Sequence, residues 1–175
     1  QHPKLLIDYR FAPNAEVENA INNYSIDMGF MTQQSNLDGV ACQAVSTEAL
    51  LLVTPAEMQQ ANWQNLLALG FIDHPDGAHH ASLLLGNNYP EFEHIAQVKK
   101  SGFSNQISLI LEPVSLGLGF TVLPTHAVEA FHSPQLINTY SLDNPVSETI
   151  YLCTPRHKSS PSRVKTTINE ALKWL

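Results

Sequence analysis

The sequence predicts an α/β fold, in which strands and helices alternate along the chain. Short apolar runs of strand-forming residues recur between segments whose apolar residues have helical spacing. Glycine, proline and asparagine separate these segments, and they are the residues that most often end helices and strands. The pattern changes at Pro55 and again near residue 145. This change indicates two lobes, the first of them built from both ends of the chain.

The beginning of the chain predicts four strands and one helix. "KLLIDYRF" (4–11) is a short apolar run that stops at "APNA", so it predicts a strand followed by a turn. Residues 14–25 have apolar side chains at helical spacing, with Asn14 available as the N-terminal cap. Three more apolar runs predict strands at 26–32, 39–45 and 48–54. Ser46-Thr47 would form a hairpin-like return between the last two.

From Pro55 onward, helices and strands alternate more regularly. The predicted helices lie at 55–70, 78–88, 104–116 and 125–132. The predicted strands lie at 71–73, 92–100, 120–124 and 135–140. Ser104 or Asn105 would cap the third helix, Pro113 would kink it, and Gly117 would end it. Gly119 would then allow close entry into the strand "FTVLP". A last strand (148–155) and an amphipathic helix (160–175) return the chain to the first lobe.

Composition limits the classes of function. A chain of 175 residues with 43% hydrophobic content can bury a sizeable core. Its nine Lys and Arg against sixteen Asp and Glu give a net charge of −7, so the chain lacks the basic surface expected of a nucleic-acid binder. The longest apolar runs are too short to span a bilayer. Cys42 and Cys153 do not suggest a disulfide framework, and we expect two buried thiols in a reducing cytosol.

No stretch predicts catalysis, a metal or a cofactor. His74, His79 and His80 lie close in sequence, but their spacing is not a zinc pattern. Neighbouring residues on a helix also point about 100° apart, so His79 and His80 do not face one ion. There is no G-x-S-x-G elbow for a nucleophile. "GLG" (117–119) follows a helix and precedes a strand, which is the reverse of the order in a dinucleotide-binding turn. We therefore expect no catalytic residue, no metal ligand and no cofactor.

Polar residues at the ends of predicted strands are the remaining candidates for a site. In open α/β sheets, ligands bind at the carboxyl ends of the strands. The residues that follow predicted strands are Arg10, Phe11, Thr32, Gln33, Asp73 and His74. The residues that open the helix predicted at 104–116 are Ser104 and Asn105, and a helix N-terminus offers unpaired N–H groups to an anion. Each of these residues alone is more often an ordinary cap or loop residue, and together they favour a cleft.

Four stretches together resemble one family. "YSIDMGFM", "EALLLVTP", "ISLILEPVSLGLGFTVLP" and "IYLCTPRHKSSPSRVKTTINEAL" are similar, in order, to segments of the effector-binding domain of LysR-type transcriptional regulators. The resemblance covers nearly the whole chain. It implies a fold like that of type 2 periplasmic binding proteins, with two Rossmann-like lobes joined by two crossover strands. Lobe I would be 1–54 plus 146–175, and lobe II would be 55–145.

The resemblance also implies a function, a site and partners. The domain would bind a small metabolite in the cleft between the lobes, and we interpret this metabolite as anionic. Binding would change the geometry of the oligomer and of its complex with DNA. The effector-binding positions would be Arg10, Phe11, Thr32, Gln33, Asp73, His74, Phe103 and Ser104. Ser104 would be the small hydroxyl at the N-terminal cap of the lobe II helix. A homodimer or tetramer in the cytoplasm is expected, with promoter DNA as a partner only through a further domain, and no membrane.

The chain opens on Gln1 and runs at once into an apolar segment, which suggests a fragment. We expect the family's first strand, first helix and winged-helix DNA-binding domain to be absent from it. Two other classes of protein stay open at this point. A solute-binding protein of a transporter would share the fold, and an enzyme is the third reading. The coding sequence upstream would discriminate between them, because a helix-turn-helix indicates a regulator and a signal peptide indicates a transporter component.

Overall fold

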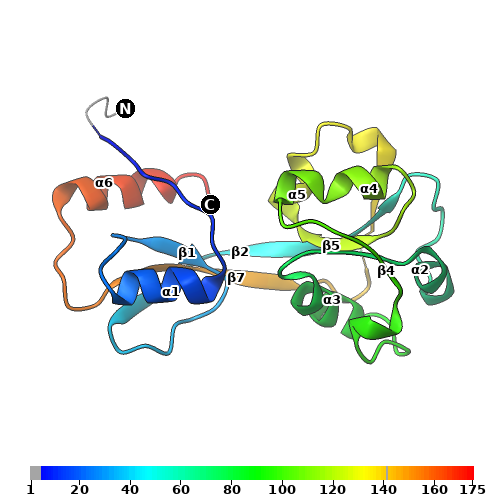
Figure 1. Ribbon diagram of the computed structural model, residues 1–175, viewed down its shortest axis with the longest axis horizontal. Helices are drawn as coiled ribbons and strands as arrows, with labels where there is room; N and C mark the ends of the chain where they lie inside the picture. Colours follow the sequence, from blue (N-terminus) through cyan, green and yellow to red (C-terminus); the bar gives the residue numbers. More distant parts are fainter. Residues whose placement is uncertain (1–4, 141) are drawn as a thin grey trace. The chain divides into compact units, whose positions relative to one another are not determined.

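The computed structural model describes residues 5–140 and 142–175. Contacts within the chain divide it into two compact units (Figure 1). Unit 1 takes the described residues up to Thr47 together with Glu148–Leu175, and unit 2 takes Glu48–Ser147. The α/β fold class predicted from the sequence is confirmed. The predicted lobe boundaries, 1–54 with 146–175 and 55–145, stay a prediction.

Unit 2 is organised around a mixed sheet. The second half of strand β2 (Val40–Pro55) pairs antiparallel with β5 (Thr121–Pro124) and with β6 (Ile137–Tyr140). Strand β3 (Phe71–Asp73) pairs in parallel with β4 (Lys100–Phe103). A parallel bridge between Phe71 and Phe120 joins this second pair to the chain entering β5.

Helices cover both faces of the unit 2 strands. Helices α2 (Trp63–Leu69) and α3 (Gly77–Gly86) lie on one side, and α4 (Leu111–Ser115) and α5 (Thr125–Glu129) lie on the other (Figure 1). Three short 3-10 turns complete the unit: η1 (Ile95–Gln97), η2 (Ile107–Leu109) and η3 (Pro134–Leu136).

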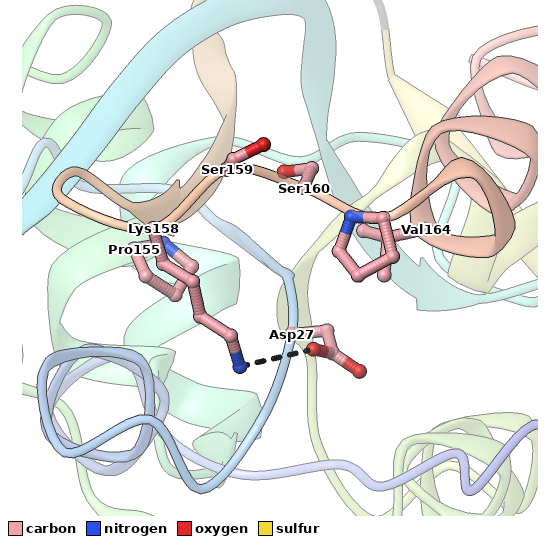
Figure 2. Close-up of a pocket in the computed structure, with 7 residues that line it drawn as sticks. Asp27, Pro155, Lys158, Ser159, Ser160 and Val164 are labelled. Atoms are coloured by element: carbon pink, nitrogen blue, oxygen red, sulfur yellow. Dashed lines mark ion pairs between the residues drawn. The ribbon is translucent and has the colours of Figure 1, made fainter.

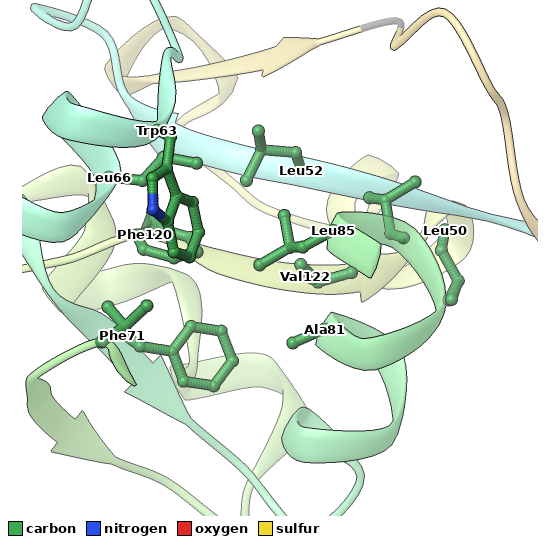
Figure 3. Close-up of a cluster of buried hydrophobic side chains, with 11 residues drawn as sticks. Leu50, Leu52, Trp63, Leu66, Phe71, Ala81, Leu85, Phe120 and Val122 are labelled. Carbon is green, nitrogen blue, oxygen red and sulfur yellow. The ribbon is translucent and has the colours of Figure 1, made fainter. Parts of the chain in front are cut away.

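The alternation of side chains along β2 supplies a core to each of these faces. Leu50 and Leu52 belong to a cluster with Trp63 and Phe120, on the side of α2 and α3 (Figure 3). Val53 belongs to a second cluster, with residues of α4 and α5. Successive residues of a strand point to opposite faces, so one strand contributes to two cores.

Unit 1 is smaller and has its own core. Its strands follow the order β1 (Gly29–Met31), β7 (Ser147–Pro155), β2, with β1 and β7 antiparallel. Helices α1 (Asn14–Asn22) and α6 (Ser162–Ala171) lie on opposite sides of these strands (Figure 1). The buried cluster beneath α1 consists of Ile21, Met31, Val40 and Cys153.

Two predicted strands are wrong. Residues 5–11 form no strand among the described residues, and the predicted strand at 92–100 is the turn η1 followed by β4. Leu6 is 98% exposed, which shows that this apolar run does not pack against a sheet. In the second case, the Gln97 side chain accepts hydrogen bonds from the backbone N–H groups of Glu93 and His94, which favours a turn over an extended chain.

The predicted hairpin at Ser46-Thr47 is also wrong, because 40–55 is one continuous strand. Neither residue is a glycine, proline or asparagine that would force a reversal, so the chain remains extended. The predicted caps differ too. Pro13, not Asn14, occupies the N-cap position of α1, and no side chain there accepts a capping hydrogen bond. The helix expected from residue 55 begins at Trp63, where the Asn62 side chain accepts a hydrogen bond from the backbone N–H of Asn65.

The helix predicted at 104–116 is broken, so Ser104 does not cap it. Residues 107–109 form η2, and α4 spans only Leu111–Ser115. Pro113 therefore lies in the first turn of a short helix, where its missing N–H is tolerated, and does not kink a long one. The prediction for Gly117 is confirmed: it follows α4 with a φ of +78°, a conformation that favours glycine. A Cβ at Gly119 would lie 2.8 Å from Ile72, so the close approach expected there is also confirmed.

The prediction of two free thiols is wrong. Cys42 on β2 and Cys153 on the neighbouring strand β7 form a disulfide, with their Cα atoms 4.3 Å apart. Their separation of 111 residues gave no sign of this. The pairing of the two strands brings the two cysteines together.

Within residues 5–140 and 142–175, no helix is both long and apolar enough to cross a membrane.

Loss of the Cys42–Cys153 disulfide is expected to lower the stability of unit 1. The bond closes a separation of 111 residues, and loops of that size gain at most about 4.7 kcal/mol in the chain-entropy account. We therefore expect a lower Tm for the Cys42→Ser/Cys153→Ser variant than for the oxidised parent, by differential scanning calorimetry. The parent treated with a thiol reductant is the matched control and should approach the variant. Equal Tm values in all three samples would contradict this account.

Candidate functional site

The residues singled out from the sequence fall into one group in each unit. Unit 2 contains Asp73, His74, Phe103 and Ser104, and unit 1 contains Arg10, Phe11, Thr32 and Gln33. We describe each group by itself. Their role in binding an effector remains a prediction.

The unit 2 group lies at the carboxyl ends of two parallel strands. Asp73 is the last residue of β3 and pairs in register with Phe103, the last residue of β4. The backbone N–H of Ser104 donates to the Asp73 carbonyl at 3.1 Å. Parallel strands end at the same edge of a sheet, which is where ligands bind in open α/β sheets. The structure therefore brings Asp73, Phe103 and Ser104 together at one edge of this strand pair, although the strand predicted at 92–100 and the helix predicted to open at Ser104 are both wrong.

The Asp73 carboxylate is held from two sides. One oxygen accepts from the His74 backbone N–H at 2.8 Å, and the other accepts from the Lys100 ammonium at 2.7 Å. The same Lys100 nitrogen lies 4.8 Å from the centre of the Phe103 ring, within range of a cation–π contact. Because one oxygen contacts the chain after β3 and the other contacts β4, the Asp73 carboxylate organises the ends of the two strands.

The His74 side chain is buried and points into the unit. Its Nε2 lies 2.9 Å from the Val122 carbonyl oxygen, and a carbonyl can only accept, so Nε2 carries the hydrogen. Burial lowers the pKa of His74 below its ordinary value of 6.5, and the hydrogen bond to Val122 opposes this shift. A neutral ring at this position ties the end of β3 to β5.

Phe103 is exposed, and Ser104 is half-buried. The Phe103 side chain is 57% exposed and offers an apolar face. The Ser104 hydroxyl donates to the Gln106 carbonyl at 3.2 Å and accepts from the Gln106 N–H at 3.1 Å. Its single hydrogen is therefore already used within the turn.

In unit 1, Thr32 lies just beyond the end of β1 and contacts the first residue of α1. The Asn14 side chain donates to the Thr32 hydroxyl oxygen at 3.0 Å and accepts from the Thr32 backbone N–H at 3.2 Å. These two hydrogen bonds fix the hydroxyl on the surface of unit 1. Gln33 follows directly and is exposed.

Arg10 and Phe11 lie in the irregular segment before α1. Both are exposed, and the Arg10 guanidinium is paired with Asp8, with one N–O distance of 2.5 Å. An effector carboxylate at Arg10 would have to displace Asp8 or share the guanidinium with it. The Phe11 ring packs edge-on against Tyr9, with ring centres 5.0 Å apart.

Asn14 and Lys100 are the polar groups that the sequence reasoning did not assign to the site. Asn14 was interpreted as a helix cap, and Lys100 as the end of a strand with no partner named. The signal for Lys100 was its charge, since Lys99 and Lys100 are the only cations between residues 48 and 147. For Asn14 no local signal exists, because its partner lies 18 positions further along the chain.

Two hollows on the described surface contain none of the predicted residues. The pocket in unit 1 shown in Figure 2 has room for only about one water molecule, with a volume of 10 Å³. Asp27 in this pocket lies 4.0 Å from Lys158, an exposed ion pair of small energetic weight. A groove in unit 2 is larger, about 680 Å³, but it is wide open to solvent. It is lined by residues of the 55–60 loop, by the α2 residues Asn65, Ala68 and Leu69, and by Gly117.

Among the residues that the structure describes, no three His, Cys, Asp or Glu side chains are grouped closely enough to hold a metal ion. The His74 and His80 rings lie 5.3 Å apart. The contacts assigned to His74 are structural.

Comparison with known proteins identifies the type of domain. The family model described as "LysR substrate binding domain" matches residues 1–175. No sequence among curated proteins matches the chain significantly.

Solved structures share the fold at low sequence identity. The CcmR regulatory domain of Synechocystis PCC6803, in complex with 2-PG, is 13% identical with a TM-score of 0.76, and the match covers 99% of this chain and 85% of that one. The effector-binding domain of QuiR, in complex with shikimate, is 15% identical with a TM-score of 0.73, covering 99% and 83%. HinK, a LysR family transcriptional regulator of Pseudomonas aeruginosa, is 14% identical with a TM-score of 0.70, and the match covers 95% of this chain but only 58% of HinK.

The burial of neutral His74 predicts that stability depends on pH. In the unfolded chain, His74 is protonated as the pH falls below its ordinary pKa of 6.5, whereas in the folded chain its pKa is lower and it stays neutral. The free energy of unfolding should therefore decrease as the pH falls through this value. We expect urea unfolding to show a loss between about pH 7.5 and about pH 5.5 that is smaller in His74→Gln. Glutamine retains an N–H donor for Val122 but does not titrate.

The groups facing His74 are His80, Asp73 and Asp76, and none of them is altered by the substitution. His79→Gln, at an exposed position of the same helix, is the matched control and should retain the parent's pH dependence. If His74→Gln and His79→Gln lose stability equally on acidification, His74 is not the group responsible.

Proposed function

The chain belongs to the LysR substrate-binding domain family, and from this premise we propose that it senses a small carboxylate effector for a LysR-type transcriptional regulator. The observation that carries the proposal is the exposed Thr32 hydroxyl just beyond β1, which the Asn14 side chain holds in place in unit 1. Effector binding is the role of the family's domain. The neighbours CcmR and QuiR hold 2-PG and shikimate, respectively.

The distribution of charge supports unit 1 as the place that binds the carboxylate. Residues 48–147 hold two Lys against nine Asp and Glu, so unit 2 accounts for the whole net charge of −7. The remainder of the chain holds seven cations and seven anions. A carboxylate is therefore repelled less by unit 1, where Thr32 presents an exposed hydroxyl.

The predicted residues then divide into contacts and supports. In unit 1, Thr32 and Gln33 would hydrogen-bond an effector. In unit 2, Phe103 would offer an apolar face to one. Ser104 retains an acceptor lone pair for a donor group on the effector. Arg10 would contribute after exchange with Asp8, and Phe11 would add apolar contact. Asp73 and His74 would support the strand ends from behind, because their polar atoms are already bonded.

We also propose the wider setting from family membership alone. The domain would act in a homodimer or tetramer, and promoter DNA would be bound through a separate domain of the regulator, in the cytoplasm. The cysteines no longer support a reducing compartment, since Cys42 and Cys153 are bonded to each other. A non-catalytic role follows from the family's function as a sensor. The solute-binding alternative is not favoured by the family match.

The effector class is tested by a binding screen. Isothermal titration of a panel of small carboxylates, shikimate among them, against their uncharged alcohol counterparts should yield carboxylate ligands only. Thr32→Ala removes a hydrogen bond to a charged group, so it should weaken the best ligand by roughly tenfold or more. Ser104→Ala should weaken it by a smaller factor, because that hydroxyl is bonded within its own turn.

Thr125→Ala is a suitable control, because it removes a hydroxyl that donates to the Ala49 carbonyl and not to any of the predicted residues. We expect it to retain the parent's affinity. The pocket assignment is wrong if both Thr32→Ala and Ser104→Ala bind the ligand as tightly as the parent does. The effector class is wrong if the alcohols bind as well as the carboxylates.

A further inference from the structure

The orientation of the Asn14 amide is determined by its contact with Thr32. The backbone N–H of Thr32 can only donate, and it lies 3.2 Å from one end of the amide, so that end must be the oxygen Oδ1. The other end, Nδ2, lies 3.0 Å from the Thr32 hydroxyl oxygen. Because an NH₂ group can only donate, the hydroxyl oxygen must accept from it.

The hydrogen of the Thr32 hydroxyl is thereby left to donate to another acceptor. A hydroxyl has one hydrogen and two lone pairs, and one lone pair is occupied by Asn14. No hydrogen bond among the described residues uses the hydrogen of this exposed group. Accepting a hydrogen bond also strengthens the same group as a donor. The Thr32 hydroxyl is therefore prepared to donate to an acceptor from outside the chain.

Ser104 provides the contrast within the same molecule. Its hydroxyl hydrogen is directed at the Gln106 carbonyl oxygen, 3.2 Å away. To donate to a ligand, Ser104 would first have to break this bond. Of the two hydroxyls among the predicted effector residues, only that of Thr32 has its hydrogen available.

We propose that Asn14 is a positioning residue that commits the Thr32 hydroxyl to donate, so that the effector group bound there is a hydrogen-bond acceptor such as a carboxylate oxygen. This inference rests on the proposed function only because it takes Thr32 as a residue that contacts the effector. Asn14 would favour ligands with a hydrogen-bond acceptor, because it fixes the Thr32 hydroxyl as a donor. A carboxylate or carbonyl oxygen satisfies the hydroxyl, whereas an ammonium group offers only donors and does not.

A purely structural role for Asn14, tying α1 to the end of β1, makes a different prediction. In that case substitution of Asn14 would change stability but not the preference between acceptor and donor ligands. The test therefore measures ligand preference, and it uses probes small enough to report on Thr32 alone.

The experiment is an NMR titration of the chain with acetate and, separately, with methylammonium, each up to about 100 mM to reach weak binding. The Thr32 backbone and methyl resonances are the readout. We expect a saturable shift with acetate and none with methylammonium. Thr32→Val retains the shape of the side chain without the hydroxyl and should abolish the acetate response.

Variants at Asn14 then separate positioning from packing. Asn14→Ala should weaken acetate binding about fivefold, the loss of one ordinary hydrogen bond. Asn14→Asp can still accept from the Thr32 N–H but also draws the hydroxyl hydrogen to itself, so it should abolish the acetate response. Ala15→Asp places the same charge on the adjacent exposed residue and should lose much less. Melting temperatures of all variants establish that they are folded.

Each outcome decides a separate claim. If acetate binds at Thr32 but Asn14→Ala and Asn14→Asp leave its affinity unchanged, the role of Asn14 is overturned while the site stands. If methylammonium binds at Thr32 as well as acetate does, or acetate gives no saturable shift, the donor role of Thr32 is overturned. Failure of the proposed function is distinct from both, since it would appear as carboxylate effectors that bind without any dependence on Thr32.

Discussion

Strand β2 is the element on which the rest of the structure depends. Its 16 residues continue without a break from unit 1 into unit 2, and it pairs with β7, β5 and β6. In unit 2 its last four residues, 52–55, are all buried, with Leu52 in one core cluster and Val53 in the other. A slip of one residue in its register would exchange these side chains between the two faces. The pattern of apolar residues therefore fixes the register.

This packing positions the candidate site in unit 2. Strand β5, paired with β2, presents the Val122 carbonyl to which His74 is bonded, and Thr121 donates its hydroxyl hydrogen to the Ile72 carbonyl. These buried hydrogen bonds hold the end of β3 where Asp73 meets Lys100. Phe103, which is exposed, and Ser104, which is half-buried, take their positions from this support. The supporting groups do not themselves need to contact a ligand.

The sequence predicted the elements whose signals are local. Strands bounded by glycine or proline and helices with clear periodicity were found near their predicted positions. Several of the failures involve partners distant in sequence. The apolar run at 5–11 has strand-forming residues but no sheet neighbour in the described structure. The disulfide and the Asn14–Thr32 contact depend on strand pairing and helix placement that no short window of sequence contains.

The central claim is that Thr32, just beyond the end of β1, donates a hydrogen bond to a small carboxylate effector. Hydrogen–deuterium exchange of the chain, with and without the carboxylate that binds best by calorimetry, tests it most directly. The account predicts slower exchange at 29–33 on binding. Protection confined to the groove residues 55–69, with no change at 29–33, would contradict it.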